Sequence, residues 1–143
     1  MDKNSFFART MHTPDSPERA RLREALREIS RTLIPLHRRL IEFAKDDYTF
    51  AYEAKARPSE MIELLQNDPF FAWLKPLTAV IVDIDEKART DFESADVDAV
   101  VNRIEQLLAD QKYIEMLQRD VDVASHHAAL RRALQRLTPG ASV

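Results

Sequence analysis

Residues 22–43, LREALREISRTLIPLHRRLIEF, carry the pattern that decides the fold class. Apolar side chains recur in this stretch at alternating intervals of four and three residues, without a gap over three heptads. This spacing is typical of an α-helix that buries one face lengthwise against other helices. The residues on the predicted face are Leu22, Leu26, Ile29, Leu33, Leu36, Leu40 and Phe43.

Signals on either side of this stretch predict the ends of the helix. Ser16 is a suitable N-cap, and Pro17 suits the first helical position. Pro35 lies inside the apolar face, and because the spacing continues in register on both sides, we predict a kink there rather than a break. The helix is expected to continue to about Ala56, since the residue before a proline, here Pro58, avoids the α conformation.

A short helix and a second long one are predicted to follow. Ser59 is expected to cap the short helix over residues 60–66. Asp68 is then an N-cap and Pro69 a first helical residue. Pro76 must kink the long helix or mark where a leading turn passes into it. The apolar face of the long helix consists of Phe70, Leu74, Leu77, Ile81, Ile84 and Ala88.

The last third of the chain is also predicted to be helical, with Ser94 as its N-cap and an apolar face beginning at Val97. The phase of the apolar positions shifts near Asp110, so one long helix and two shorter helices both remain open. We therefore predict an all-α fold: an up-and-down antiparallel bundle of about four long helices plus one short helix, with kinks at Pro35 and Pro76. Residues 15–143 are assigned to one domain, and residues 1–14 to a loose N-terminal arm.

The composition excludes several classes of protein. The only glycine among 143 residues is Gly140. This argues against hairpin-rich folds, because their tight turns usually need glycine, and it leaves no Walker loop and no dinucleotide-binding fingerprint. The absence of cysteine excludes disulfides, thiolate nucleophiles and cysteine-bound clusters, and fits a reducing compartment. We see no secretory signal and no apolar run long enough to span a membrane, and expect a cytoplasmic protein.

The charge distribution argues against nucleic-acid binding. The net charge is −3, and the basic residues of the first half are interleaved with acidic ones. A nucleic-acid-binding domain usually concentrates its basic residues on one face. Residues 1–57 carry 12 Lys or Arg and 9 Asp or Glu, whereas residues 58–143 carry 9 and 15. We expect the basic helix to pack beside acidic ones, or to face them across a dimer interface.

No assembled set of catalytic or metal-ligating residues appears in the sequence. No histidine follows a glutamate at the spacing that di-iron bundles use, so we predict no metal and no cofactor. His37, Trp73 and Asp85 lie close in sequence to the two expected proline kinks and are candidate pocket residues. Tyr48 and Tyr52 lie one helical turn apart, and an exposed aromatic stripe there would mark a binding surface. We predict no catalytic residue.

The segment LLQNDPFFAWLKPL at residues 64–77, followed by Ile84-Asp85-Glu86, resembles a group of small bacterial helical proteins of unassigned function. The upstream tripeptide Leu36-His37-Arg38 belongs to the same resemblance. Together these residues cover less than a fifth of the chain. The resemblance implies a bacterial, intracellular helical protein and implies no activity.

The long apolar faces, the uneven charge and the surplus of aromatic side chains favour one function. We predict a non-catalytic interaction or oligomerisation module that forms a homodimer or binds a protein partner. The alternative is a helical bundle that binds a small ligand or a metal in a pocket near the proline kinks. A hydrolase or transferase ranks third, because no catalytic constellation is assembled.

Overall fold

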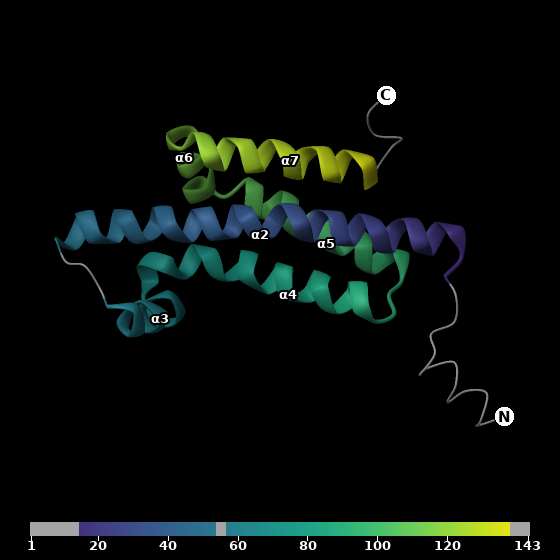
Figure 1. The fold of residues 1–143 in the computed structure, drawn as a ribbon, viewed down its shortest axis with the longest axis horizontal. Coiled ribbons are helices and arrows are strands. Elements are labelled where there is room, and N and C mark those ends of the chain that lie inside the picture. Colours follow the sequence, from purple (N-terminus) through teal and green to yellow (C-terminus); the bar gives the residue numbers. More distant parts are fainter. Residues whose placement is uncertain (1–14, 54–56, 138–143) are drawn as a thin grey trace, which may run out of the picture.

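The computed structural model describes residues 15–53 and 57–137, and this part of the chain is all-α, with no β-strand. The predicted arm at residues 1–14 lies outside the described residues. Six α-helices and one 3₁₀ helix follow one another, joined by short connections (Figure 1). In chain order they are α2 (Pro17–Tyr52), α3 (Pro58–Asn67), η1 (Pro69–Leu74), α4 (Lys75–Arg89), α5 (Ser94–Leu108), α6 (Gln111–Arg119) and α7 (Val121–Leu137).

The start of α2 is as predicted. The Ser16 side chain accepts a hydrogen bond from the backbone N–H of Arg19 at 3.2 Å, and Pro17 is the first helical residue. The helix runs through Pro35 without interruption. It ends at Tyr52, not near Ala56, because Glu53 adopts the left-handed conformation that commonly terminates a helix.

The buried face of α2 follows the predicted spacing for six of its seven positions. Ala44 replaces Phe43 at the last position, with none of its surface exposed. A straight α-helix has 3.6 residues per turn, so a strict 3.5-residue pattern drifts around it by about 20° per heptad. Phe43 is therefore only partly buried, and the guanidinium groups of Arg39 and Arg119 lie over its ring.

Two predicted helix starts need correction. α3 begins at Pro58 with Arg57 as its N-cap, so Ser59 lies in the first turn and does not cap it. α5 has Glu93 as its N-cap in place of Ser94, and the Glu93 N–H donates to Asp96 Oδ2 at 2.7 Å. Pro76 lies in the first turn of α4, directly after 3₁₀ helix η1, so of the two predicted alternatives it marks where a leading turn passes into the long helix and does not kink it.

The C-terminal third divides into three helices. A break at Asp110 separates α5 from α6, and the Asp110 side chain caps α6 through the Lys112 N–H at 2.9 Å. A second break at Asp120, which the sequence did not predict, separates α6 from α7. The described residues therefore contain one short helix more than predicted.

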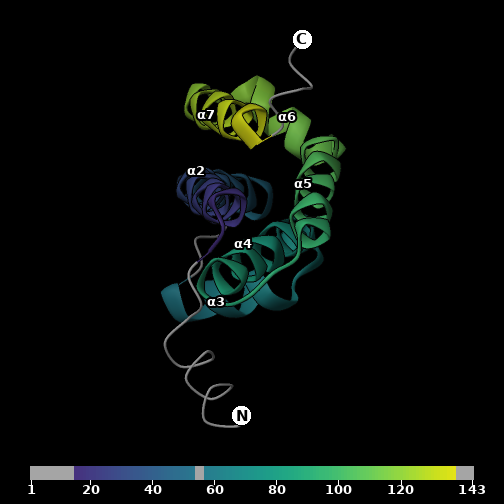
Figure 2. The same ribbon diagram turned by 90° about the vertical axis from the view of Figure 1, so that its right-hand side faces the viewer.

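The 36-residue helix α2 lies between α7 and α4 (Figures 1 and 2). Both neighbours run antiparallel to it. For α4, Arg23 in the N-terminal half of α2 donates to the Ala88 carbonyl near the end of α4 at 2.9 Å, and His37 Nε2 lies 2.8 Å from Thr78 Oγ1 near the start of α4. For α7, ion pairs join the N-terminal half of α2 to the end of α7 and its C-terminal half to the region where α7 begins. These pairs are Glu28–Arg136, Arg39–Asp120 and Asp47–Arg119. The end-on view shows α7, α5 and α4 around three sides of α2.

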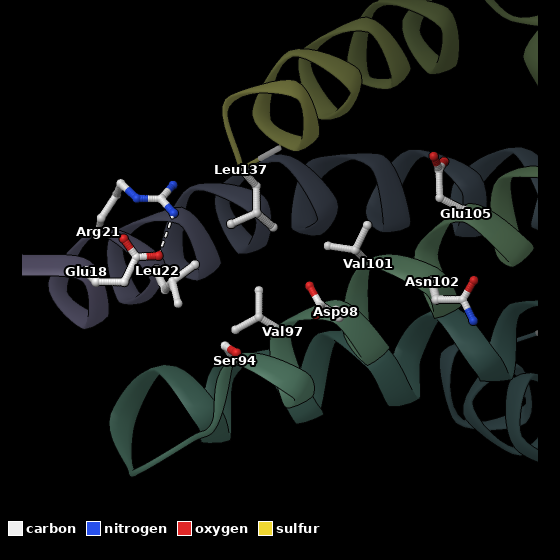
Figure 3. Close-up of a pocket in the computed structure, with 10 residues that line it drawn as sticks. All are labelled: Glu18, Arg21, Leu22, Ser94, Val97, Asp98, Val101, Asn102, Glu105 and Leu137. Carbon is white, nitrogen blue, oxygen red and sulfur yellow. Dashed lines mark hydrogen bonds and ion pairs between the residues drawn. The ribbon is translucent and has the colours of Figure 1, made fainter. Parts of the chain in front are cut away.

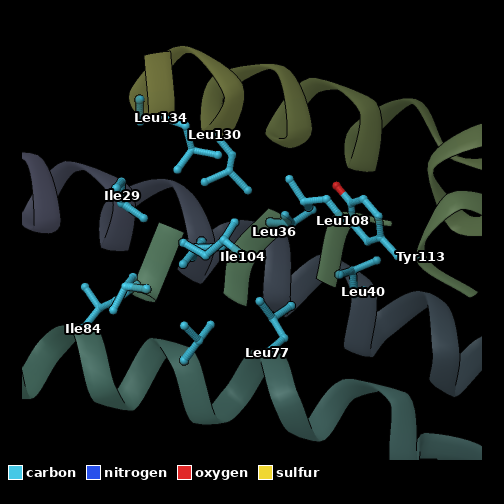
Figure 4. Close-up of a cluster of buried hydrophobic side chains, with 14 of the residues drawn as sticks. Ile29, Leu36, Leu40, Leu77, Ile84, Ile104, Leu108, Tyr113, Leu130 and Leu134 are labelled. Atoms are coloured by element: carbon cyan, nitrogen blue, oxygen red, sulfur yellow. The ribbon is translucent and has the colours of Figure 1, made fainter. Parts of the chain in front are cut away.

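The core is one contiguous cluster of apolar side chains from all six α-helices and η1. Figure 4 shows its centre, where α2 contributes Ile29, Leu36 and Leu40. No polar or charged residue is buried within residues 15–53 and 57–137. Burial of apolar surface therefore stabilises the packing of the helices, and hydrogen bonds and ion pairs of polar side chains lie around the core.

Candidate binding groove

A groove of about 630 Å³ opens between α2, α3 and the start of α4. This volume lies within the range of ligand pockets in proteins, about 300–1,000 Å³. Most of the lining side chains are apolar, and the charge at the groove comes from a single lysine. The lining consists of His37 and Ile41 from α2, Leu65 and Gln66 from α3, Leu74 from η1, and Lys75, Thr78, Ala79 and Val82 from α4.

His37 and Thr78 form a polar pair in this apolar lining. His37 Nε2 lies 2.8 Å from Thr78 Oγ1, and the Thr78 hydroxyl donates to the backbone carbonyl of Leu74 at 3.2 Å. Because the hydroxyl has one proton and donates it to Leu74, it accepts from the His37 Nε2–H. Partial burial lowers the pKa of His37 below its usual value, which favours the neutral ring.

Large apolar side chains remain exposed beside the groove. Val82, which lines the groove, is 62% exposed. Ile34 is 43% exposed and lies on α2, three residues before His37. An apolar groove flanked by exposed apolar side chains is typical of a surface that contacts another molecule.

The structure does not bring the three candidate pocket residues together. His37 lines the groove, whereas Trp73 and Asp85 do not. Asp85 is exposed and pairs with Arg89 of its own helix at 3.1 Å. Trp73 packs partly buried against the core, and its Nε1 is buried without a hydrogen-bond partner.

Tyr48 and Tyr52 form an aromatic cluster with the two phenylalanines of η1. The Tyr48 ring centroid lies 4.7 Å from that of Tyr52, 5.4 Å from that of Phe70 and 5.5 Å from that of Phe71. Tyr52 is exposed, Tyr48 is partly buried and Phe71 is fully buried. Phe50 points away and is 88% exposed. These contacts attach the end of α2 to η1, so packing accounts for most of the predicted aromatic surface.

Sequence reasoning missed two polar pairs between helices. Asp83, not Asp85, is the part-buried carboxylate of α4, and it pairs with Lys87 at 2.5 Å and Arg103 at 2.6 Å. The Tyr113 hydroxyl lies 2.6 Å from His127 Nδ1, and burial raises the pKa of Tyr113 and lowers that of His127. Their spacing of 14 residues has no local signal, because the two residues meet only when α6 and α7 pack together.

A second, smaller pocket of about 350 Å³ lies where the start of α2 and the end of α7 meet α5 (Figure 3). Leu22, Val97 and Leu137 lie among charged side chains there, and Arg21 pairs with Glu18 at 3.0 Å. The spacing predicted these apolar residues as parts of buried faces. Nothing in their spacing shows that three helices leave a gap at this point.

The chain matches no protein-family model, no curated protein and no solved structure. The function is therefore inferred from the geometry of the groove. Within the described ranges, no three or more His, Asp or Glu side chains form a group that could hold a metal ion. None of the helices in that part of the chain is both long enough and apolar enough to cross a membrane.

Proposed function

We propose that this protein is a non-catalytic interaction module that forms a homodimer through its groove. The observation that carries the proposal is Val82, a large apolar side chain that lines the groove and is 62% exposed. The exposed Ile34 extends this surface along α2. A second copy would bury both side chains and remove their apolar surface from water.

The proposal includes the finer architecture and the setting of the protein. We propose an up-and-down bundle, supported by the ion pairs that join α2 to the antiparallel α7. We also propose a bacterial, cytoplasmic setting. The cysteine-free composition and the resemblance carried by residues 64–77 support this setting.

Replacement of Val82 by aspartate tests the proposal. Dimer formation would bury an unpaired carboxylate, so we expect the dissociation constant of Val82→Asp to rise at least tenfold. Val121→Asp is the matched control, because Val121 is 81% exposed at the start of α7 and an aspartate there suits the helix dipole. Light scattering at tens of micromolar should show a dimer for the wild type and for Val121→Asp. A monomeric wild type would overturn the proposal.

The volume and lining of the groove favour one second candidate function, the binding of a small apolar molecule. The His37–Thr78 pair would then supply the polar contact that orients the molecule. Native mass spectrometry of the purified protein should show an additional bound mass. Ala79→Trp, which fills the groove from an exposed position, should abolish it. If the wild type has the mass of the polypeptide alone, this candidate is excluded.

A further inference from the structure

The outward face of α4 carries a symmetrical pattern of residues. Four exposed residues follow the spacing 4-3-4, with a lysine at one end, a glutamate at the other and two apolar residues between them. They lie opposite the buried face of the helix, which contains Leu77, Val80, Ile84 and Ala88. We call this set the outer stripe: Lys75, Ala79, Val82 and Glu86.

The outer stripe is complementary to itself when it is reversed. If two α4 helices lie antiparallel about a twofold axis that passes between positions 80 and 81, Lys75 of one copy is opposite Glu86 of the partner subunit. In the same register, Ala79 is opposite Val82 of the partner subunit, so a small side chain meets a larger one. A twofold axis makes each of these contacts twice. The 4-3-4 spacing is also that of a seam between two packed helices.

The charges at the ends of the outer stripe have no ion-pair partner in the described part of the chain. Other charges of α4 pair within the molecule: Asp83 with Lys87 at 2.5 Å, and Asp85 with Arg89 at 3.1 Å. The carboxylate of Asp83 also pairs with Arg103 of α5. Lys75 and Glu86 remain, both exposed and of opposite sign. Their separation of 11 residues, about 16 Å along a helix, is too long for a pair within α4.

The groove and the outer stripe share one edge. Lys75, Ala79 and Val82 belong to both, so a helix that packs on the outer stripe also covers the groove from the side of α4. Val82 of the partner subunit would approach Ala79, the smallest side chain of the lining. Three features of this face therefore favour the same occupant, a second copy of the chain. These features are its exposed apolar residues, the position of its smallest residue and its unpaired charges.

We infer that two copies of this chain pair through antiparallel α4 helices in this register, with two Lys75–Glu86 ion pairs between the copies. The inference rests on the proposed self-association and adds the surface, the direction and the register. The ion pairs select the register more than they add affinity, because the rim of an interface remains hydrated. The apolar residues between the ion pairs supply the affinity.

Charge exchange tests the register. Lys75→Glu and Glu86→Lys should each raise the dissociation constant of the dimer about tenfold, because each places two like-charged pairs across the interface. The double variant Lys75→Glu/Glu86→Lys should restore it to within about twofold of the wild type, since opposite charges again meet. The matched control is Arg132→Glu, which makes the same change of charge as Lys75→Glu at an exposed arginine of α7. It should leave the dissociation constant unchanged.

Disulfide trapping tests the direction of the pair, and the absence of native cysteines makes it specific. Ala79→Cys and Val82→Cys chains with tags of different mass should be mixed and oxidised. The mixed disulfide should form faster than either symmetrical disulfide, because positions 79 and 82 lie directly opposite each other in the antiparallel register. Preferential formation of either symmetrical disulfide would overturn the register.

The outcomes separate this inference from the proposed function. If the wild type is a dimer that neither Lys75→Glu nor Glu86→Lys weakens, self-association stands and pairing through α4 is wrong. If only the single variants weaken the dimer and the double variant does not restore it, Lys75 and Glu86 do not face each other. A monomeric wild type overturns both proposals, and a monomer with a bound small molecule assigns the groove to that molecule.

Discussion

Replacement of Ile29 by alanine is expected to lower the free energy of unfolding by about 2–5 kcal/mol. Ile29 has none of its surface exposed and lies in α2, the helix around which α4, α5 and α7 pack (Figure 4). The substitution removes three carbons from a closely packed core and leaves a cavity that the neighbouring helices fill only in part. Urea denaturation followed by circular dichroism measures the change.

The matched control for Ile29→Ala is Ile62→Ala. Ile62 lies in α3 and is 61% exposed, so the same substitution there should change the free energy of unfolding by less than about 1 kcal/mol. Both variants should be measured at one protein concentration, because self-association adds to apparent stability. Equal effects of the two substitutions would contradict the assignment of Ile29 to the core.

Replacement of Asp120 by alanine is expected to cost about 2 kcal/mol of stability. The Asp120 carboxylate accepts two hydrogen bonds from Arg39 at 2.8 and 2.9 Å, and also accepts from the backbone N–H of Val123 at 3.1 Å. Asp120→Ala therefore removes both a bidentate ion pair and a helix cap. Asp120→Asn retains a cap without the charge and should cost about 1 kcal/mol. Thermal or urea unfolding at pH 7 distinguishes the two variants.

The contribution of Asp120 should depend on pH in a defined direction. The hydrogen bonds from Arg39 hold the pKa of Asp120 below its usual value of 3.8, and the Val123 N–H adds to this lowering. A lowered carboxyl pKa stabilises the folded protein above pH 3.8, and this stability is lost as the pH falls through the lower native pKa. The difference between the wild type and Asp120→Asn should therefore shrink below about pH 4.

The course of the chain through α2 could be predicted because its signals are local. A serine followed by a proline at Pro17, and apolar residues at helical spacing, act within a few residues of one another. The errors at Ser59 and Ser94 arose because the N-cap of each helix precedes the serine. Pro58 suits the first helical position and places the start of α3 before Ser59. The hydrogen bond from the Glu93 N–H to Asp96 places the start of α5 before Ser94.

The candidate site was predictable only in part. His37 was identified because it follows Pro35 on the edge of a buried face, and it lines the groove. Asp85 was proposed because it lies close in sequence to the expected kink at Pro76, yet the part-buried carboxylate of α4 is Asp83. Arg103 of α5 lies 20 residues from Asp83 in the sequence and pairs with its carboxylate. This contact between helices distinguishes Asp83 from Asp85. The groove itself could not be predicted, since its walls come from α2, α3, η1 and α4.

The sequence by itself determined that the chain is helical, where α2 starts and which face of each long helix is apolar. These properties depend on backbone preferences and on a period of 3.6 residues, which act within single helices. Only the tertiary structure decided which apolar residues are buried, which charges find partners and where a groove remains. Val80 and Ile81 show the reason: the spacing places Ile81 on the apolar face of α4, yet Ile81 is only partly buried, whereas the neighbouring Val80 has none of its surface exposed. Burial depends on which surfaces meet when the helices pack, and this cannot be read from the spacing of residues along one helix.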